Sequence, residues 1–166
     1  MIRLSGIVSA LFACVASMSL PVIASMTPQQ TIRGMVGKWS CVTHDDTNKE
    51  WRASTTDSIY GPWLRLNESY GAQNSEPAGT AVKFLGFDSS HRRWIVTSVD
   101  SSGGYYVIYS ASHSFDGSKW KDGFPADKGT ASIKVVNPNI YVFNAASPDE
   151  RGRISKSHTV CTRIFK

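Results

Sequence analysis

The chain has 166 residues, of which 18 are lysine or arginine and 13 are aspartate or glutamate, so its formal net charge is +5. The excess of positive charge is modest and scattered, and no basic run of five or more residues occurs, so we expect no nucleic-acid partner. The sequence also lacks the Gly-x-Ser-x-Gly, His-Glu-x-x-His and phosphate-loop motifs, which argues against the commonest hydrolase, metalloprotease and nucleotide-binding sites.

Residues 1–24 are predicted to be a signal peptide. Arg3 is their lone charge, and the run Leu4–Ala24 ends in small or aliphatic residues suited to signal peptidase. Pro21 interrupts this run and disfavours a stable membrane span. We therefore expect residues 25–166 to form a single mature domain that is periplasmic or secreted.

The three cysteines fit an exported protein. Cys14 leaves with the signal peptide, although the loose lipobox Leu11–Cys14 keeps a lipoprotein open as an alternative. Cys41 and Cys161 then remain, one near each end of the mature domain. In an oxidising compartment such a pair is predicted to form a disulfide rather than a catalytic dithiol, because catalytic cysteines usually lie close together in the sequence.

A short helix is expected to open the mature domain. Thr27 suits the N-cap, Pro28 suits the first helical position, and Gln30 can complete a capping box. A short apolar stripe follows, and Gly37 ends the helix.

The rest of the chain predicts an all-β domain. Short segments rich in Val, Ile, Thr, Tyr and Trp recur about every ten residues between Gly, Asp, Asn, Ser and Pro, with no sustained helical period, which favours an antiparallel sandwich or barrel. The predicted strands are Lys38–Thr43, Glu50–Ser58, Trp63–Tyr70, Thr80–Phe87, Trp94–Asp100, Tyr105–Ala111, Lys119–Asp122, Thr130–Val136, Ile140–Ala145 and Ile154–Phe165.

The segment Gly37-Lys38-Trp39, a Gly-x-Trp at the start of the first strand, resembles the opening motif of lipocalins and the wider calycin superfamily. The stretch from Phe84 to Asp100 also resembles uncharacterised bacterial domains of this barrel type. The resemblance implies an antiparallel up-and-down barrel of about 8–10 strands that holds a small apolar ligand in its lumen. It further implies that Trp39 closes one end beneath a basic residue of the last strand, for which Arg163 is the candidate.

Barrel closure can be examined from the residue numbers. If the first and last strands pair antiparallel, Cys41 opposite Cys161 and Trp39 opposite Arg163 fall in one register and on one face. The more apolar residues of the last strand, Val160, Thr162 and Ile164, lie on the opposite face from Cys161 and Arg163, however. We therefore expect either a bulge or a disulfide on the outer face.

Several side chains are candidates for the lumen. If Leu64 and Leu66 face inward, Glu68 enters the cavity and is a candidate acid–base residue, and the alternative is a carboxylate at a strand end in solvent. His158 lies on the same strand face as apolar neighbours and is a second catalytic candidate. The resemblance also allows an axial haem ligand, as in some barrels of this class, and the alternative is a hydrogen-bonded structural histidine. The expected lining residues are Leu64, Leu66, Phe84, Trp94 and Tyr109.

The leading functional hypothesis is an exported monomer that binds a small apolar or aromatic ligand, with no metal site and no cofactor. The alternatives are an enzyme of the same fold, such as an isomerase or cyclase using Glu68 or His158, a haem-binding barrel using His158, and an envelope role without a ligand. The sequence leaves open whether the barrel contains a cavity or is filled by its own side chains.

Overall fold

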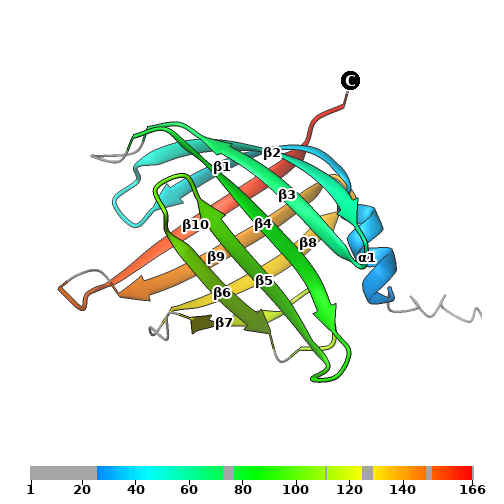
Figure 1. The fold of residues 1–166 in the computed structure, drawn as a ribbon. Helices are drawn as coiled ribbons and strands as arrows, with labels where there is room; N and C mark the ends of the chain where they lie inside the picture. Colours follow the sequence, from blue (N-terminus) through cyan, green and yellow to red (C-terminus); the bar gives the residue numbers. More distant parts are fainter. Residues whose placement is uncertain (1–25, 73–76, 111, 125–128, 149–150, 166) are drawn as a thin grey trace, which may run out of the picture.

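A computed structural model describes residues 26–72, 77–110, 112–124, 129–148 and 151–165, so the predicted signal peptide and Cys14 lie outside the described residues. One helix, α1 (Pro28–Met35), is followed by ten antiparallel strands that form a closed barrel in sequence order (Figure 1). This confirms the predicted fold class. The strands are β1 (Gly37–Asp45), β2 (Glu50–Tyr60), β3 (Trp63–Tyr70), β4 (Gly79–Asp88), β5 (Arg93–Asp100), β6 (Tyr105–Ser110), β7 (Lys119–Phe124), β8 (Thr130–Asn137), β9 (Ile140–Pro148) and β10 (Ile154–Arg163).

Helix α1 begins as the sequence predicts. The Thr27 hydroxyl accepts a hydrogen bond from the Gln30 backbone N–H, and the Gln30 side chain accepts one from the Thr27 backbone N–H, which completes the capping box. The helix lies against the ends of β2, β3 and β4 and buries Ile32 there (Figure 1). It therefore covers one end of the barrel.

The first and last strands meet in the predicted register. Cys41 lies opposite Cys161 and Trp39 opposite Arg163, and Cys41 and Cys161 form a disulfide. The expectation of a bulge or an outward disulfide is wrong, because the register is continuous and both cysteines are buried on the inner face. The odd-numbered residues of β10 face inward, although the even-numbered ones are more apolar.

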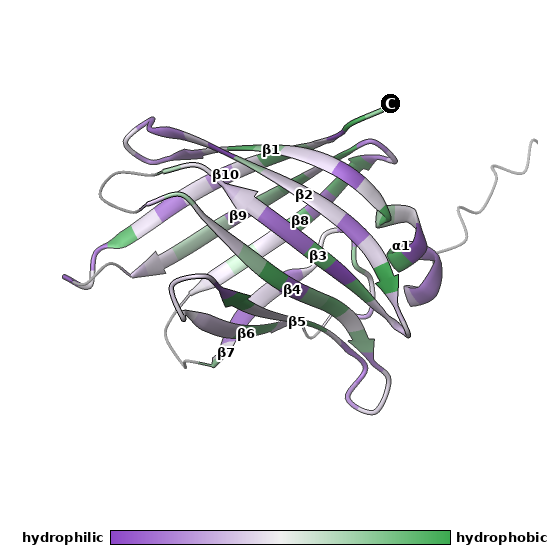
Figure 2. Cartoon of the chain, turned by 45° about the horizontal axis from the view of Figure 1, so that its top comes forward, coloured by the Kyte–Doolittle hydropathy of each residue, from purple (hydrophilic) through white to green (hydrophobic). Residues whose placement is uncertain are grey.

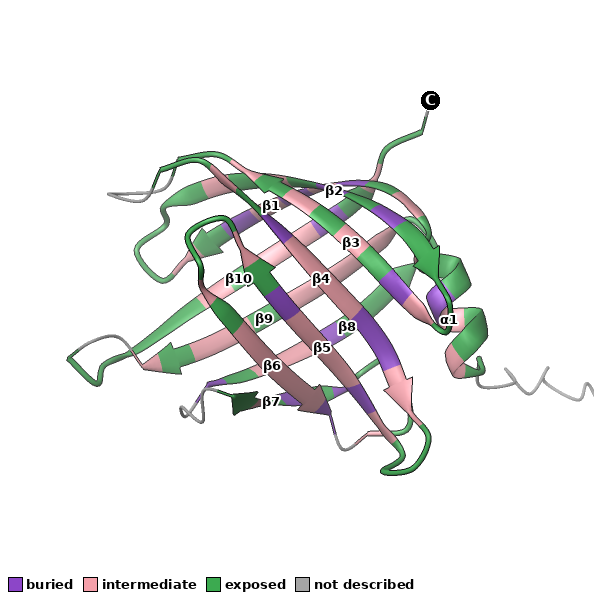
Figure 3. Ribbon diagram, in the orientation of Figure 1, coloured by how far each residue is buried: buried purple, intermediate pink, exposed green. Residues whose placement is uncertain are grey.

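Side chains alternate between the lumen and the outer wall, so buried and exposed residues, and hydrophobic and hydrophilic ones, are interspersed along the strands (Figures 2 and 3). The hydrophobic core is concentrated toward the end covered by α1. It consists of Ile32, Leu64, Leu85, Trp94, Phe115, Trp120 and Ile133. This packing closes one end of the barrel and leaves space in the lumen beyond it.

Within the described residues, the structure contains no helix that is both long enough and apolar enough to span a bilayer.

Candidate functional site

The lumen contains a cavity of about 230 Å³ above the packed floor. Aromatic and aliphatic side chains form most of its wall, and the disulfide forms part of one side. The lining residues are Met35, Cys41, Thr43, Trp51, Ala53, Thr55, Leu66, Glu68, Tyr70, Lys83, Leu85, Val96, Tyr106, Ile108, Phe115, Ile133, Tyr141, Phe143, Thr159 and Cys161. The barrel is therefore not completely filled by its own side chains.

An ion pair interrupts this apolar wall. Lys83 Nζ on β4 donates a hydrogen bond to Glu68 Oε2 on β3, and both side chains are about one fifth exposed. Burial alone would lower the pKa of the Lys83 ammonium. Interactions with Tyr106 and with the hydrogen-bonded Glu68 carboxylate instead hold that pKa above its ordinary value. Lys83 is therefore a charged donor at neutral pH and not a free-amine nucleophile.

A second carboxyl group, Asp57 on β2, lies inside the barrel and is only 3 % exposed. Neither carboxylate oxygen has a hydrogen-bond partner in the described part of the chain. Burial raises the pKa of Asp57 to about 7, and the negative charge of Glu68 contributes in the same direction. Asp57 is therefore partly protonated near neutral pH, although it does not line the cavity itself.

Of the sequence-predicted site residues, the structure brings Leu66 and Glu68 to the cavity wall. The solvent-exposed alternative for Glu68 is wrong, because its side chain points inward and pairs with Lys83. Leu64 and Trp94 also face inward, but they are almost fully buried in the core toward the α1 end. They support the floor of the cavity and are not part of its lining.

Phe84 and Tyr109 do not line the lumen, and these two predictions are wrong. Their strand neighbours Lys83, Leu85 and Ile108 face inward, so strand alternation directs both aromatic rings to the outer wall. There Phe84 packs against Tyr60 with ring centroids 5.6 Å apart. The Tyr109 ring lies under the Arg93 guanidinium at 4.9 Å.

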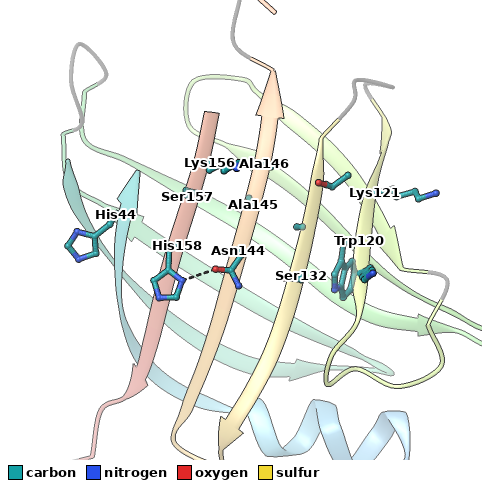
Figure 4. Close-up of a pocket in the computed structure, with 13 residues that line it drawn as sticks. His44, Trp120, Lys121, Ser132, Asn144, Ala145, Ala146, Lys156, Ser157 and His158 are labelled. Carbon is teal, nitrogen blue, oxygen red and sulfur yellow. Dashed lines mark hydrogen bonds between the residues drawn. The ribbon is translucent and has the colours of Figure 1, made fainter. Parts of the chain in front are cut away.

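His158 is likewise on the outer wall, because its neighbour Thr159 lines the lumen. It is exposed, and its Nδ1 forms a 2.7 Å hydrogen bond with Asn144 Oδ1 (Figure 4). It borders a hollow of about 600 Å³ lined by residues of β1 and β7–β10, among them Trp120, three lysines, and several alanine and small polar side chains. A lumenal role for His158, in catalysis or as an axial haem ligand, is therefore wrong for this fold.

Sequence reasoning missed Asp57, Lys83 and Tyr106. Polar residues at inward positions are rare, so the apolar pattern of a strand is normally taken to mark its buried face. On β4 that rule fails, because Lys83 faces inward and Phe84 faces outward. One signal was usable. Once the hairpin registers are known, Lys83, its partner Ser98 and the next partner, Tyr106, form one transverse row of polar residues.

Within the described residues, no group of three or more histidine, cysteine, aspartate or glutamate side chains is arranged to hold a metal ion. The carboxyl groups nearest the cavity are instead held by Lys83, in the case of Glu68, or isolated, in the case of Asp57.

No protein-family model and no curated protein sequence matches this chain. Among solved structures, the S-type phycobiliprotein lyase CPES from Guillardia theta is similar with a TM-score of 0.59 and 10% identity, covering 85% of this chain and 94% of the lyase. A redesigned β-barrel, b11L5F_LGL, has a TM-score of 0.49 and 12% identity over 86% of this chain and all of that one. A second redesigned β-barrel, mFAP0 bound to DFHBI, has a TM-score of 0.48 and 11% identity, covering 78% of this chain and 99% of that one.

The likeness to the lyase is a likeness of fold. It agrees with the closed barrel of ten antiparallel strands that the structure shows.

Proposed function

We propose that this chain is an exported barrel that binds a small apolar or aromatic ligand inside its lumen. The observation that carries the proposal is the cavity of about 230 Å³, which is open space within an otherwise well-packed barrel. Natural interiors leave few voids larger than a water molecule, so a space of this size with an aromatic wall indicates a ligand site.

The chemistry of the wall supports an apolar body for the ligand. Trp51, Tyr70 and Phe143 offer aromatic surface, and Leu66 and Val96 offer aliphatic surface. Burial of a ligand against these side chains is favoured by about 25 cal/mol for each Å² of apolar area removed from water. Export is supported by the sequence of residues 1–24 and by a disulfide whose partners are far apart in the chain.

Fluorescence can test internal binding. A neutral, polarity-sensitive dye with a single aromatic ring should gain intensity on mixing and should lose it when toluene competes. Ala53→Leu adds three carbons to the cavity wall and should weaken binding at least about tenfold, since core space of this kind is not readily recovered. Ala146→Leu adds the same atoms on the outer wall and is the matched control.

Thermal unfolding of both variants should show that they are folded at the assay temperature. If the dye gains no fluorescence on mixing, or if no neutral aromatic or aliphatic compound reduces that fluorescence, the proposal fails. The barrel would then serve a role without a lumenal ligand.

An enzyme of the same fold is the second candidate, and Asp57 is the observation that favours it. A carboxyl with a pKa of about 7 is suited to proton transfer at neutral pH. The group is one layer removed from the cavity wall, so it would have to act through Thr55 or a bound water. Conversion of any bound compound that Asp57→Asn abolishes would favour the enzyme over the binding module.

A further inference from the structure

Three polar side chains form a transverse row on one wall of the lumen. Lys83 on β4 lies opposite Ser98 on β5, and Ser98 lies opposite Tyr106 on β6. Glu68 on β3 reaches the same point and pairs with the Lys83 ammonium. The charged side chains of the cavity thus lie on one wall, which four adjacent strands form, while Thr43, Thr55 and Thr159 add hydroxyl groups from β1, β2 and β10.

The charges on this wall cancel. Lys83 and Glu68 are the only lysine, arginine, aspartate or glutamate side chains among the cavity-lining residues that the structure describes. Asp57 lies close enough to interact electrostatically with both of them, and it adds no positive charge. The electrostatic balance of the site is therefore neutral or slightly negative before a ligand enters.

Hydrogen-bonding capacity remains on both members of the ion pair. A lysine ammonium has three donors, and the hydrogen bond to Glu68 Oε2 uses one of them. A carboxylate accepts through two oxygens, and Lys83 bonds to Oε2 of Glu68. The side chains of Lys83 and Glu68 both line the cavity, so one donor and one acceptor lie side by side at its wall.

We propose that the lumenal ligand is an uncharged molecule whose apolar body ends in a group that both donates and accepts hydrogen bonds, such as a hydroxyl or a carboxamide, seated on Lys83 and Glu68. This inference rests on the proposed function. The ligand group accepts from Lys83 and donates to Glu68. The apolar remainder lies against Trp51, Phe143 and their neighbours.

Charged ligands fit this wall less well. A carboxylate would add negative charge beside Glu68, and Lys83 is already paired. An ammonium would compete with Lys83 for Glu68 and place two cations together. In each case a charge enters the low-dielectric lumen without a free counter-ion at the cavity wall, because Asp57 does not line the cavity, and this is unfavourable.

The cavity volume sets the size of the ligand. An engineered protein cavity of about 150 Å³ holds benzene, so about 230 Å³ holds one ring with a small substituent. Four compounds of that size form a matched series: toluene, benzamide, benzoate and benzylammonium. They share the ring and differ in the group presented to the polar wall.

Binding of the series can be measured by following the methyl NMR signals of Leu66, Val96 and Ile108, which line the cavity. Benzamide should bind at least about tenfold more tightly than benzoate or benzylammonium. In the double variant Glu68→Gln, Lys83→Met, the affinity of benzamide relative to toluene should fall about tenfold, which corresponds to the loss of one or two net hydrogen bonds. Lys134→Met, an exposed position on β8, is the matched control and should leave that ratio unchanged.

The double variant removes both charges together, so it leaves neither member of the ion pair without its partner, and the toluene affinity reports whether the cavity survives. Tighter binding of benzoate or benzylammonium, or an unchanged benzamide-to-toluene ratio in the double variant, would overturn the inference while internal binding stands. Failure of all four compounds to bind would overturn the proposed function and this inference with it.

Discussion

The guanidinium carbon of Arg163 lies 4.2 Å from the centre of the Trp39 ring. The same guanidinium donates hydrogen bonds to the backbone carbonyls of Gly34, Val36 and Pro138. One side chain of β10 thus joins the first strand, the end of α1 and the turn before β9. The glycine of the Gly-x-Trp motif has φ +143°, which L side chains rarely adopt, and a Cβ there would also lie 2.6 Å from Arg163 Nη1.

Trp39 is 2 % exposed and donates through Nε1 to the Met35 carbonyl. Trp39→Ala should therefore reduce the free energy of unfolding by about 3–5 kcal/mol. Arg163→Ala should have an intermediate effect. Because the two residues are in contact, the double variant should lose less than the sum of the two single losses, as measured by chemical denaturation. Strictly additive losses would contradict an energetic role for the pair.

The disulfide joins residues 120 apart in sequence, although their strands are neighbours. Free-thiol titration of the mature protein under denaturing, non-reducing conditions should find essentially no reactive thiol. Replacement of Cys41 and Cys161 by serine should lower the free energy of unfolding by about 4 kcal/mol, since a long loop is released in the unfolded state. Two titratable thiols in exported material would contradict the native bridge.

Gly86 on β4 lies under the indole ring of Trp63. A Cβ at this position would come within 2.1 Å of the ring, so Gly86→Ala should destabilise the barrel by about 1–3 kcal/mol through overpacking. Gly71→Ala is the matched control, because its Cβ would meet nothing within 4 Å. In a Trp63→Ala background the Gly86→Ala penalty should largely disappear. Equal melting temperatures for the two glycine variants would contradict this packing.

The number and order of the strands could be predicted from sequence because turn residues recur between short β-branched and aromatic segments. All ten predicted strands are present, and Trp63–Tyr70 has the predicted bounds. The register of β1 against β10 was also predictable, since the positions of Cys41 and Cys161 define it. These features depend on local pattern and on one covalent constraint.

The facing of side chains was less predictable, and it decides the site. Lys83 can face inward because Glu68 on the neighbouring strand neutralises it, and that pairing is a contact between strands which residue type alone does not reveal. The same contact leaves Phe84 outside. On β10, likewise, Thr159 faces inward beside Thr43, and a 2.8 Å hydrogen bond joins their hydroxyls, which directs His158 outward.

Asp57 makes a prediction about pH, because its pKa is raised to about 7 in the folded protein from an ordinary value of 3.8. Between these two values the unfolded chain releases the proton while the folded chain retains it. The contribution of the Asp57 proton to the free energy of unfolding is therefore complete below about pH 4, decreases as pH rises, and is lost by about pH 7. A shift of about three units corresponds to a change on the order of 4 kcal/mol.

Asp57→Asn removes this titration while preserving the shape of the side chain. Chemical denaturation of both proteins between pH 4 and pH 8 should show that the variant gains stability relative to wild type as pH rises, and that the gain levels off above about pH 7. Asp116→Asn is a suitable comparison, because Asp116 accepts a backbone hydrogen bond from Val135 at an exposed site. This variant shows the effect of the same Asp→Asn change at the protein surface. A constant difference between Asp57→Asn and wild type at every pH would mean that the Asp57 carboxyl titrates normally, and the unpartnered buried oxygens would then have to be solvated by water within the barrel.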